Sequence, residues 1–478
     1  RITARLVPNA TDPHVRLVLD AGGDIDLDDI SLVPEHTWKD RPGGLRADLV
    51  QWLDDLKPGF IRFPGGCIVE GRRLENRYQW KTTIGPKEDR KLIINRWNDE
   101  FKHRPTPDYY QSFDVGFFEF FQLCEDLGTQ PLPILNCGMA CQFNSGEVTP
   151  LGELDPYIQD ALDLIEFARG PATSAWGRRR AEMGHPEPFT LTMLGVGNEQ
   201  WGPAYFERYT AFTKALKAKH PEIRLVSSAG PAPADDRFRS AWDFLRQAGA
   251  DIIDEHCYDR PSWFFSAATR FDRYDRQGPK VFMGEYAAQS VAVGSPDNRN
   301  TWECALAEAA FMTGLERNAD VVVMSSYAPL FAHAEGWQWT PDLIWFDNLR
   351  SYGTPSYYVQ QLFSRNRGDV VVPVTLDDPQ ASGLFTTVSL EKATSTLILK
   401  VVNATADTVK VRVRTAGAGK RTGKARVVQI AAGLGDQNSF EEPRKVAPTT
   451  SHGRDVLGPD ATEFPAHSVT VLRLEPAS

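Results

Sequence analysis

Two patterns of apolar and polar positions divide the chain. From about residue 35 to 366, short apolar runs alternate with longer segments in which apolar residues recur at helical spacing. In one such pair, "QPLPILNCG" predicts a strand and "DPYIQDALDLIEFARG" predicts a helix with Asp155 as N-cap and Pro156 at its first position. This alternation is typical of a parallel sheet with helices outside it.

The number of strands in this region favours a barrel. Seven apolar runs have strand character, which predicts an eight-stranded (β/α) TIM barrel with one strand missing or displaced. An open, doubly wound sheet is the alternative. No GxGxxG motif follows the first strand, which disfavours that alternative.

The two ends of the chain have a different pattern of apolar and polar residues. Residues 367–478 show period-two runs such as "STLILKVVNAT" and "SVTVLRLEP" between turn residues, which predicts a C-terminal antiparallel β-sandwich. Residues 1–34 also read as strands separated by Gly22 and Gly23, but this segment is too short to be a domain alone. We therefore expect the barrel to occupy residues 35–366.

Composition and charge exclude some classes of protein. The 478 residues exceed what one core usually supports, and the net charge of −10 without a basic cluster disfavours a nucleic-acid partner. No apolar stretch is long enough for a membrane helix, so we expect no membrane association. The six Cys form no CxxC pair, and we expect most of them to be buried free thiols.

Candidate chemistry lies where the predicted strands end. The carboxyl ends of barrel strands meet at one face, and two of them carry the carboxylates Glu199 and Glu285. A pair of this kind suits glycoside hydrolysis, in which one carboxyl group donates a proton and the other attacks carbon or activates water. The alternative is that each glutamate forms a strand-end salt bridge.

Six sequence blocks, in order along the chain, resemble the α-L-arabinofuranosidases of glycoside hydrolase family 51. The resemblance runs from about residue 30 to the end and implies a retaining enzyme without metal or other cofactor, built as a (β/α)₈ barrel followed by a β-sandwich. The blocks are "FIRFPGGCIVEG", "NRYQWKTTIGP", "LGVGNEQWG", "HCYDRPSWF", "VFMGEYAA" and "YAPLFAHAEGWQWTPDLIWFDN" with the "TPSYYVQQLFS" that follows it.

The resemblance also implies roles for individual residues. Glu199 matches the general acid/base, and Glu285 matches the nucleophile. Asn198 matches the amide that holds the 2-hydroxyl of the sugar. Tyr258 matches a tyrosine beside the nucleophile, and His256, two residues earlier on the same strand face, is either its supporting partner or a core histidine.

Other residues are candidates for contact with substrate. Cys67 follows two glycines where better-known members carry Asn, and a thiol is a poor hydrogen-bond donor, so a sugar contact there is lost or passes to the backbone. Trp201 and Trp263 follow strand ends, where aromatic rings stack on sugars or simply pack. Asn348, in "WFDN", is a further candidate.

The resemblance sets the expected substrate and partners. The leading hypothesis is release of terminal arabinofuranose from plant cell-wall polysaccharide (arabinoxylan or arabinan) or from arabino-oligosaccharides. The alternatives are an endo-β-1,4-glucanase, a xylanase or another furanosidase with the same residues, and a non-catalytic carbohydrate-binding protein. We expect secretion, and a homo-oligomer is compatible with the family.

The N-terminal segment has its own expected origin. In the longer branch of the family, a carbohydrate-binding β-sandwich is inserted after the first barrel strand. Residues 1–34 resemble the tail of that insert, and the chain begins with neither Met nor an apolar signal core. We therefore expect an N-terminal fragment of the same precursor as a partner.

Overall fold

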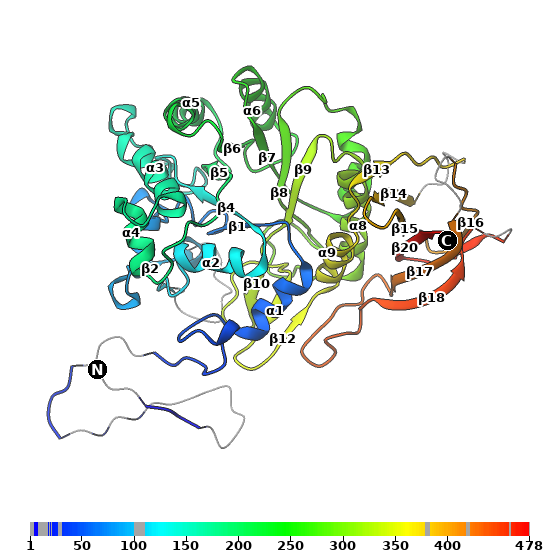
Figure 1. The fold of residues 1–478 in the computed structure, drawn as a ribbon, viewed down its shortest axis with the longest axis horizontal. Helices are drawn as coiled ribbons and strands as arrows, with labels where there is room; N and C mark the ends of the chain where they lie inside the picture. Colours follow the sequence, from blue (N-terminus) through cyan, green and yellow to red (C-terminus); the bar gives the residue numbers. More distant parts are fainter. Residues whose placement is uncertain are drawn as a thin grey trace.

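The centre of the molecule is a sheet of seven parallel strands surrounded by helices (Figure 1). The computed structural model describes residues 4–7, 18, 20, 22–26, 31–99, 110–377, 383–416, 421–457 and 460–477. The strands follow one another across the sheet in chain order: β1 (Phe60–Phe63), β4 (Gln130–Leu135), β5 (Met193–Val196), β6 (Arg224–Ser228), β7 (Ile252–Asp259), β8 (Lys280–Ala288) and β9 (Val322–Tyr327).

This sheet confirms the predicted barrel and excludes the doubly wound alternative. Each strand pairs in parallel with the next, and helices lie outside the ring (Figure 1). Within the described residues the sheet has seven strands, so the barrel is nearly closed, with β1 and β9 as its edges. All four residues of β5 are buried, whereas three of the four in β1 are partly exposed.

The surrounding helices bury apolar faces against the sheet. Gly116 precedes α2 and lies against Thr83, where any side chain would collide with the backbone carbonyl, and Gly128 ends the helix in a left-handed conformation with φ of 63°. The sequence predicts Asp155 as an N-cap, but the helix already begins at Asp155, and its N-cap is Leu154, one residue earlier. The helices are α1 (Ala47–Leu56), α2 (Phe117–Leu127), α3 (Asp155–Arg169), α4 (Ala175–Glu182), α5 (Pro203–Lys219), α6 (Asp236–Gln247), α7 (Pro261–Ser266), α8 (Trp302–Arg317) and α9 (Pro355–Arg365).

The C-terminal part is an antiparallel structure beside α8 and α9 (Figure 1). One face of its main sheet packs on α8, and the other buries apolar residues with Phe464 of a two-stranded sheet, so the predicted sandwich has two unequal layers. The six-stranded sheet has the order β13 (Val370–Val372), β14 (Leu384–Glu391), β15 (Thr396–Asn403), β20 (Ser468–Pro476), β17 (Arg421–Ala431) and β18 (Thr449–Asp455), and the small sheet pairs β16 (Val409–Val411) with β19 (Thr462–Phe464).

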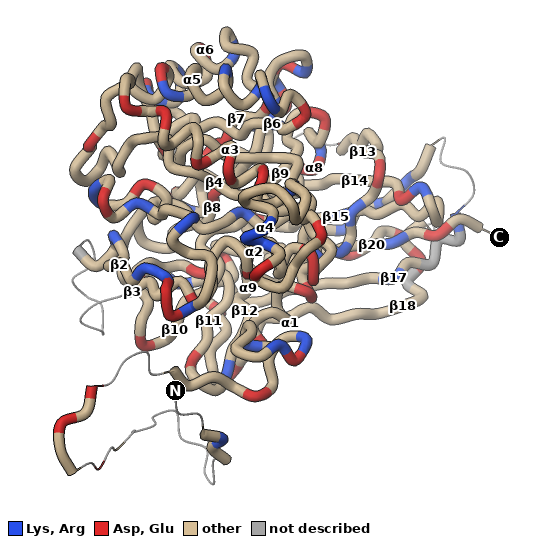
Figure 2. Tube along the Cα trace, turned by 60° about the vertical axis from the view of Figure 1, so that its left-hand side comes forward, with Lys and Arg blue, Asp and Glu red and all other residues tan. Residues whose placement is uncertain are grey.

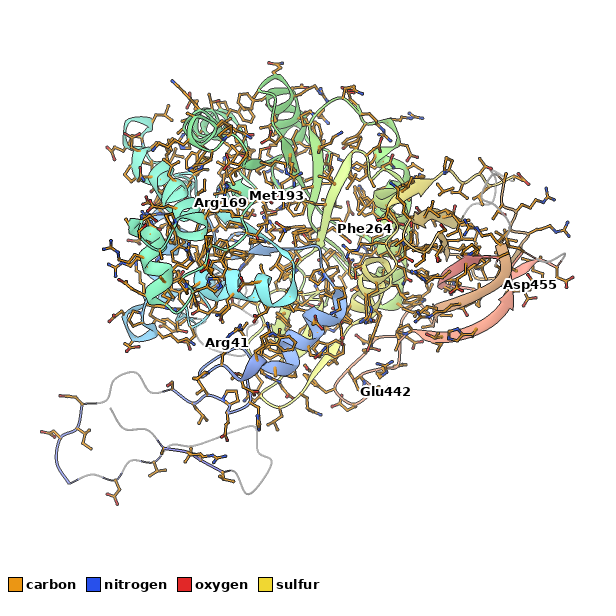
Figure 3. The ribbon with its side chains drawn as sticks, viewed as in Figure 1. Arg41, Arg169, Met193, Phe264, Glu442 and Asp455 are labelled. Carbon is orange, nitrogen blue, oxygen red and sulfur yellow. The ribbon has the colours of Figure 1, made fainter. Side chains whose placement is uncertain are left out.

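Several short strands lie outside the two large sheets. Figure 3 labels Met193, at the start of β5 in the barrel, and Asp455, at the end of β18 on the far side of the antiparallel sheet. The remaining strands form one three-stranded sheet and one two-stranded antiparallel sheet: β10 (Phe331–His333), β11 (Ile344–Phe346) and β12 (Ser351–Gly353), and β2 (Ile93–Ile94) with β3 (Tyr110–Gln111).

Other sequence expectations can be compared with the structure. All six cysteines are free thiols, and five are buried, as predicted for most of them. Figure 2 shows acidic and basic positions interspersed along the chain. No helix in the described part of the chain is both long and apolar enough to cross a membrane. The strands predicted in residues 1–34 lie largely outside the described residues.

Candidate active site

Glu199 follows β5 through an unusual turn. Gly197 and Glu199 have positive φ of 77° and 53°, a conformation that glycine accepts readily and glutamate adopts at a cost. Gln200 holds this turn, because its Oε1 accepts a hydrogen bond from the backbone N–H of Asn198 at 2.5 Å. The turn directs the Glu199 side chain, which is only 10% exposed, toward His256 on β7.

Glu285, on β8, is held by two donors and a glycine. The Tyr258 hydroxyl donates to its Oε2 at 2.8 Å, and Nη1 of Arg62 donates to its Oε1 at 2.8 Å. A Cβ atom at Gly66 would lie 2.8 Å from Oε1, so the predicted glycine turn packs directly on this carboxylate. Both donors stabilise negative charge on Glu285.

The two glutamates converge although two strands separate β5 from β8 in the sheet. A carboxylate oxygen of Glu199, one of Glu285 and a ring nitrogen of His256 all lie within 4.8 Å of one another. His256 Nδ1 is 2.9 Å from Glu199 Oε1 and 3.5 Å from Glu285 Oε2. The curvature of the barrel therefore brings both carboxylates to one side of a single imidazole.

His256 carries a positive charge between these groups. Its Nε2 lies 3.3 Å from Asp254 Oδ2, so both ring nitrogens face carboxylates and the doubly protonated ring satisfies both. Burial lowers the pKa of His256, but the charges of Glu285 and Asp254 and its hydrogen bonds raise it well above the ordinary value. Gly284 leaves the space for Asp254, because a side chain there would collide with that carboxylate.

Glu199 and His256 share a proton. Burial raises the pKa of Glu199, but the hydrogen bond and charge of His256, with a smaller contribution from Cys67, bring that pKa below its ordinary value. Both directions favour the proton of this pair on the imidazole. A 2.9 Å hydrogen bond between Nδ1 and Oε1 joins the imidazole directly to the carboxylate.

Arg62 links Glu285 to Asn198, the residue before Glu199. Its Nη2 donates to Asn198 Oδ1 at 2.5 Å, and Asn198 Nδ2 donates to Glu70 Oε2 at 2.8 Å, so both ends of this amide have protein partners. Burial raises the pKa of Glu70 well above its usual range. The sequence analysis gave Arg62 no role. The signal that could have identified Arg62 is its position inside β1, whose other residues are apolar.

The alternation of β7 identifies a second missed residue. Asp254, His256 and Tyr258 lie two apart, so they share the inner face of the strand. Glu255 faces outward and accepts a hydrogen bond from Trp242 Nε1 at 3.0 Å. The sequence analysis named His256 and Tyr258 but not Asp254, which the same period of two could have identified.

The described residues contain two groups of side chains that could hold a metal ion. One is the cluster of Glu199, His256 and Glu285. The other consists of Cys67, Glu70 and Cys141, with ligand atoms within 4.8 Å of one another. Cys67 Sγ lies 3.4 Å from Glu199 Oε2, and a hydrogen bond with Cys67 lowers the pKa of Cys141 to about 7.

Aromatic rings border the carboxylates. The ring of Trp339 packs against Tyr258 at 5.4 Å between centroids. Trp201, two residues after Glu199 in the loop, contacts Phe143 at 5.2 Å and lies under the guanidinium of Arg237 at 4.9 Å. Phe143 is 57% exposed, so this ring of the second group is accessible to solvent.

Two predicted contact residues lie apart from this cluster. The Trp263 ring packs on Phe264 and on Phe311 of α8, in the layer outside the sheet, which is the arrangement of a packing residue. Asn348 lies in the loop between β11 and β12, where its Oδ1 is 3.0 Å from His333 Nε2. The structure brings together six of the predicted residues: Glu199, Glu285, Asn198, Tyr258, His256 and Cys67. Trp201 is two residues after Glu199 in the chain.

Comparison with known proteins connects this geometry to a family. Residues 52–276 match the model of the α-L-arabinofuranosidase 1 domain, and residues 284–468 match that of the α-L-arabinofuranosidase C-terminal domain. A solved structure of an arabinose-bound GH51 α-L-arabinofuranosidase is similar, with a TM-score of 0.79, 32% identity, and coverage of 92% of this chain and 68% of that one.

Curated relatives agree with these matches. An extracellular exo-α-L-arabinofuranosidase of Streptomyces chartreusis is 44% identical over 80% of this chain and 46% of its own length. α-L-Arabinofuranosidase 1 of Arabidopsis thaliana is 38% identical over 93% and 63%, and α-L-arabinofuranosidase A of Aspergillus niger is 34% identical over 95% and 68%. The chain thus spans about half to two thirds of the length of these relatives. It belongs to the α-L-arabinofuranosidase family, glycoside hydrolase family 51.

Proposed function

We propose that this chain carries the active site of a retaining α-L-arabinofuranosidase. The supporting observation is the separation of the two carboxylates, whose oxygens approach within 4.8 Å. Retaining glycosidases hold their carboxyl groups about 5–5.5 Å apart, whereas inverting enzymes need roughly 6.5–9.5 Å to admit a water molecule. The proposed substrates are terminal α-L-arabinofuranosyl groups of arabinoxylan, arabinan or derived oligosaccharides.

In the first step, Glu285 attacks the anomeric carbon while Glu199 protonates the leaving oxygen. Arg62 and Tyr258 hold the nucleophile through one donor on each oxygen. The proton begins on His256 and passes through Nδ1 to Glu199 Oε1 and then to the leaving group. The carbon–oxygen bond to the leaving group breaks as the bond to Glu285 forms, and His256 is left neutral.

In the second step, Glu199 acts as a base. Bond formation removes the negative charge of Glu285, which is the largest attraction that raises the pKa of His256. The neutral imidazole and ionised Glu199 then accept a proton from water as its oxygen attacks the sugar. Glu285 leaves as a carboxylate, and the proton returns to the Glu199–His256 pair.

Neighbouring residues supply the proposed sugar contacts. Asn198 Nδ2 has two hydrogens and gives one to Glu70, so the other can bind the 2-hydroxyl in an orientation fixed from both ends of the amide. Trp201 is two residues after Glu199, the proposed proton donor, and packs on Phe143, so we assign this pair a stacking contact with the sugar on the leaving-group side. Cys67 contacts Glu199 itself.

The wider roles of the protein are part of this proposal. The Streptomyces relative is named as extracellular and exo-acting, which supports a secreted enzyme that removes terminal sugars. Division into a barrel over residues 35–366 and a β-sandwich over 367–478 is the proposed domain organisation. An N-terminal fragment of the precursor and a second copy of the chain remain proposed partners.

Substitution of each glutamate tests the assignment on 4-nitrophenyl α-L-arabinofuranoside. We expect Glu285→Ala to abolish release of 4-nitrophenol, and Glu199→Ala to slow hydrolysis by about 10²–10⁴-fold. Azide should restore activity to Glu199→Ala, because an anion that needs no base replaces water in the second step. Glu222→Ala is the matched control, since Glu222 pairs with Arg169 on the surface.

Two outcomes would contradict the proposal. Unchanged rates in both Glu199→Ala and Glu285→Ala would remove the catalytic assignment. Proton NMR of the first product from the wild-type chain tests the stereochemistry separately, and an inverted anomer would exclude double displacement.

A further inference from the structure

We propose that Cys67, Glu70 and Cys141 form a binding site for one thiophilic divalent cation, such as Zn²⁺ or Cd²⁺, and that its occupation inhibits the enzyme through Glu199. The binding half depends only on these three side chains. The inhibitory half rests on the proposed function of Glu199.

The donor set and its spacing suit such an ion. Two sulfurs and a carboxylate oxygen within 4.8 Å of one another are a ligand set typical of zinc. Tetrahedral bonds of about 2.3 Å to sulfur and 2.0–2.2 Å to oxygen place ligand atoms roughly 3.3–3.8 Å apart, so the three side chains need to close by no more than about 1.5 Å. Glu199 Oε2 lies 3.4 Å from Cys67 Sγ, so an ion bound to Cys67 would lie beside this carboxylate.

The backbone holds the two ligand loops together. Cys67 and Glu70 lie in the turn after β1, and Cys141 lies in the loop after β4. The N–H of Cys141 donates to the carbonyl of Gly71 at 3.1 Å. Asn136 Nδ2 donates to the carbonyl of Glu70 at 3.4 Å and to a carbonyl of the second loop at 2.9 Å. These bonds fix the loops without using any ligand atom, which is the support that a metal site requires.

Charge and access are also compatible with a cation. Two thiolates and a carboxylate carry three negative charges, of which a divalent ion neutralises two. Arg96 lies close enough to act electrostatically on Cys67, Glu70 and Cys141, and its positive charge balances the third. Cys67 is half-buried whereas Cys141 is buried, so the ion reaches the site past Cys67.

Occupation of this site would disturb the catalytic groups in two ways. Glu70 Oε2 accepts the hydrogen bond that orients Asn198, and a metal ion would compete for the same carboxylate. A cation beside Cys67 would also oppose the arrival of a proton on Glu199. Both effects reduce the rate of the step that protonates the leaving group.

Titration with Cd²⁺ tests the binding half on the full chain, with a phosphine reductant present to keep the thiols reduced. We expect a saturable sulfur-to-cadmium charge-transfer absorption at one equivalent, lost in Cys141→Ser and retained in Cys304→Ser, whose thiol lies buried on α8. Circular dichroism checks that each variant is folded. Absence of a saturable band, or its persistence in Cys141→Ser, would overturn the site.

Alkylation of the wild-type chain tests the same ligands without a variant. We expect Zn²⁺ to slow alkylation of Cys67 at least tenfold, read by peptide mass spectrometry, and to leave Cys304 unaffected. Equal rates at Cys67 with and without Zn²⁺ would contradict the proposal.

Hydrolysis of the aryl arabinofuranoside tests the inhibitory half. We expect Zn²⁺ to inhibit the wild-type chain reversibly, with EDTA restoring activity, and Cys141→Ser to need at least ten times more Zn²⁺ for half-inhibition. Binding of Cd²⁺ without inhibition by Zn²⁺ would overturn the coupling to Glu199. Absence of activity before any metal is added would instead count against the proposed function.

Discussion

Strands β8 and β15 are both buried along nearly their whole length, and each carries a charged side chain. Glu285 on β8 faces Arg62, Tyr258 and His256 at the carboxyl end of the barrel. Lys400 on β15 has a fully buried side chain that donates to Glu316 of α8 and lies 5.1 Å from the ring of Phe363. One strand thus holds a charge in a network, and the other holds a charge in a single pair.

The difference shows what marks a reactive site in this fold. Burial lowers the pKa of Lys400, and the charge of Glu316 only partly restores it, so the pair joins the antiparallel sheet to α8 and has no third group with which to exchange a proton. His256, in contrast, contacts three carboxyl groups, and its proton has an alternative position on Glu199. The number of ionisable partners, more than burial, distinguishes the two regions.

Replacing Arg62 should break the network most severely. Arg62→Met removes a donor from Glu285 and from Asn198 and leaves carboxylates buried without their cation. We expect kcat/KM on the aryl arabinofuranoside to fall about 10²–10³-fold, and the free energy of unfolding to fall by about 3–5 kcal/mol. Steady-state kinetics and thermal melting measure the two effects, and activity within threefold of wild type would contradict the role given to Arg62.

Replacing Lys400 should change stability alone. In Lys400→Met the remaining Glu316 side chain is 20% exposed and can be hydrated, so we expect the free energy of unfolding to change by only about 1–3 kcal/mol. At a temperature where both proteins are folded, kcat should stay within about twofold of wild type. Denaturant unfolding and the aryl glycoside assay check this, and a loss of activity similar to that of Arg62→Met would erase the distinction between the strands.

The sequence predicts much of the barrel because each strand pattern is local. The apolar run before Glu285 and the glycines around Glu199 identify both carboxylates at strand ends, and the period of two puts His256 and Tyr258 on one face. The convergence of β5 and β8 requires curvature, which no local pattern encodes; it follows only once a barrel is assumed.

Residues that act through partners were harder to predict. Arg62 and Glu70 gain their roles from Asn198, which is more than a hundred positions away in the chain. Trp263 has the same local sequence character as Trp201, yet it packs against α8 because its helix lies outside the sheet. The pairing of Cys67 with Cys141 depends on two loops meeting, and the residues around each thiol give no sign of it.

Replacing His256 should remove the group that can exchange a proton with Glu199. The site would then resemble that of Lys400, which has no third group for such an exchange. The wild-type chain loses the shared proton as pH rises through the raised pKa of His256, which sets the alkaline limb of activity. In His256→Asn only Glu199 can hold that proton. Burial still favours its protonated form, but a carboxyl group loses the proton at lower pH than this histidine. We therefore expect the alkaline limb of kcat/KM to move down by about one pH unit or more.

The same substitution should have a pH-dependent effect on stability. A pKa raised in the folded state stabilises fully below the unfolded value of about 6.5, and this contribution is lost as pH rises through the folded pKa. The difference in melting temperature between wild type and His256→Asn should therefore be largest in acid and shrink toward alkaline pH. His220→Asn, at the end of α5, is the matched control for the activity measurement, and its alkaline limb of kcat/KM should not move. If the limb of His256→Asn also stays in place, the proton does not start on the imidazole, and Glu199 must hold it unaided.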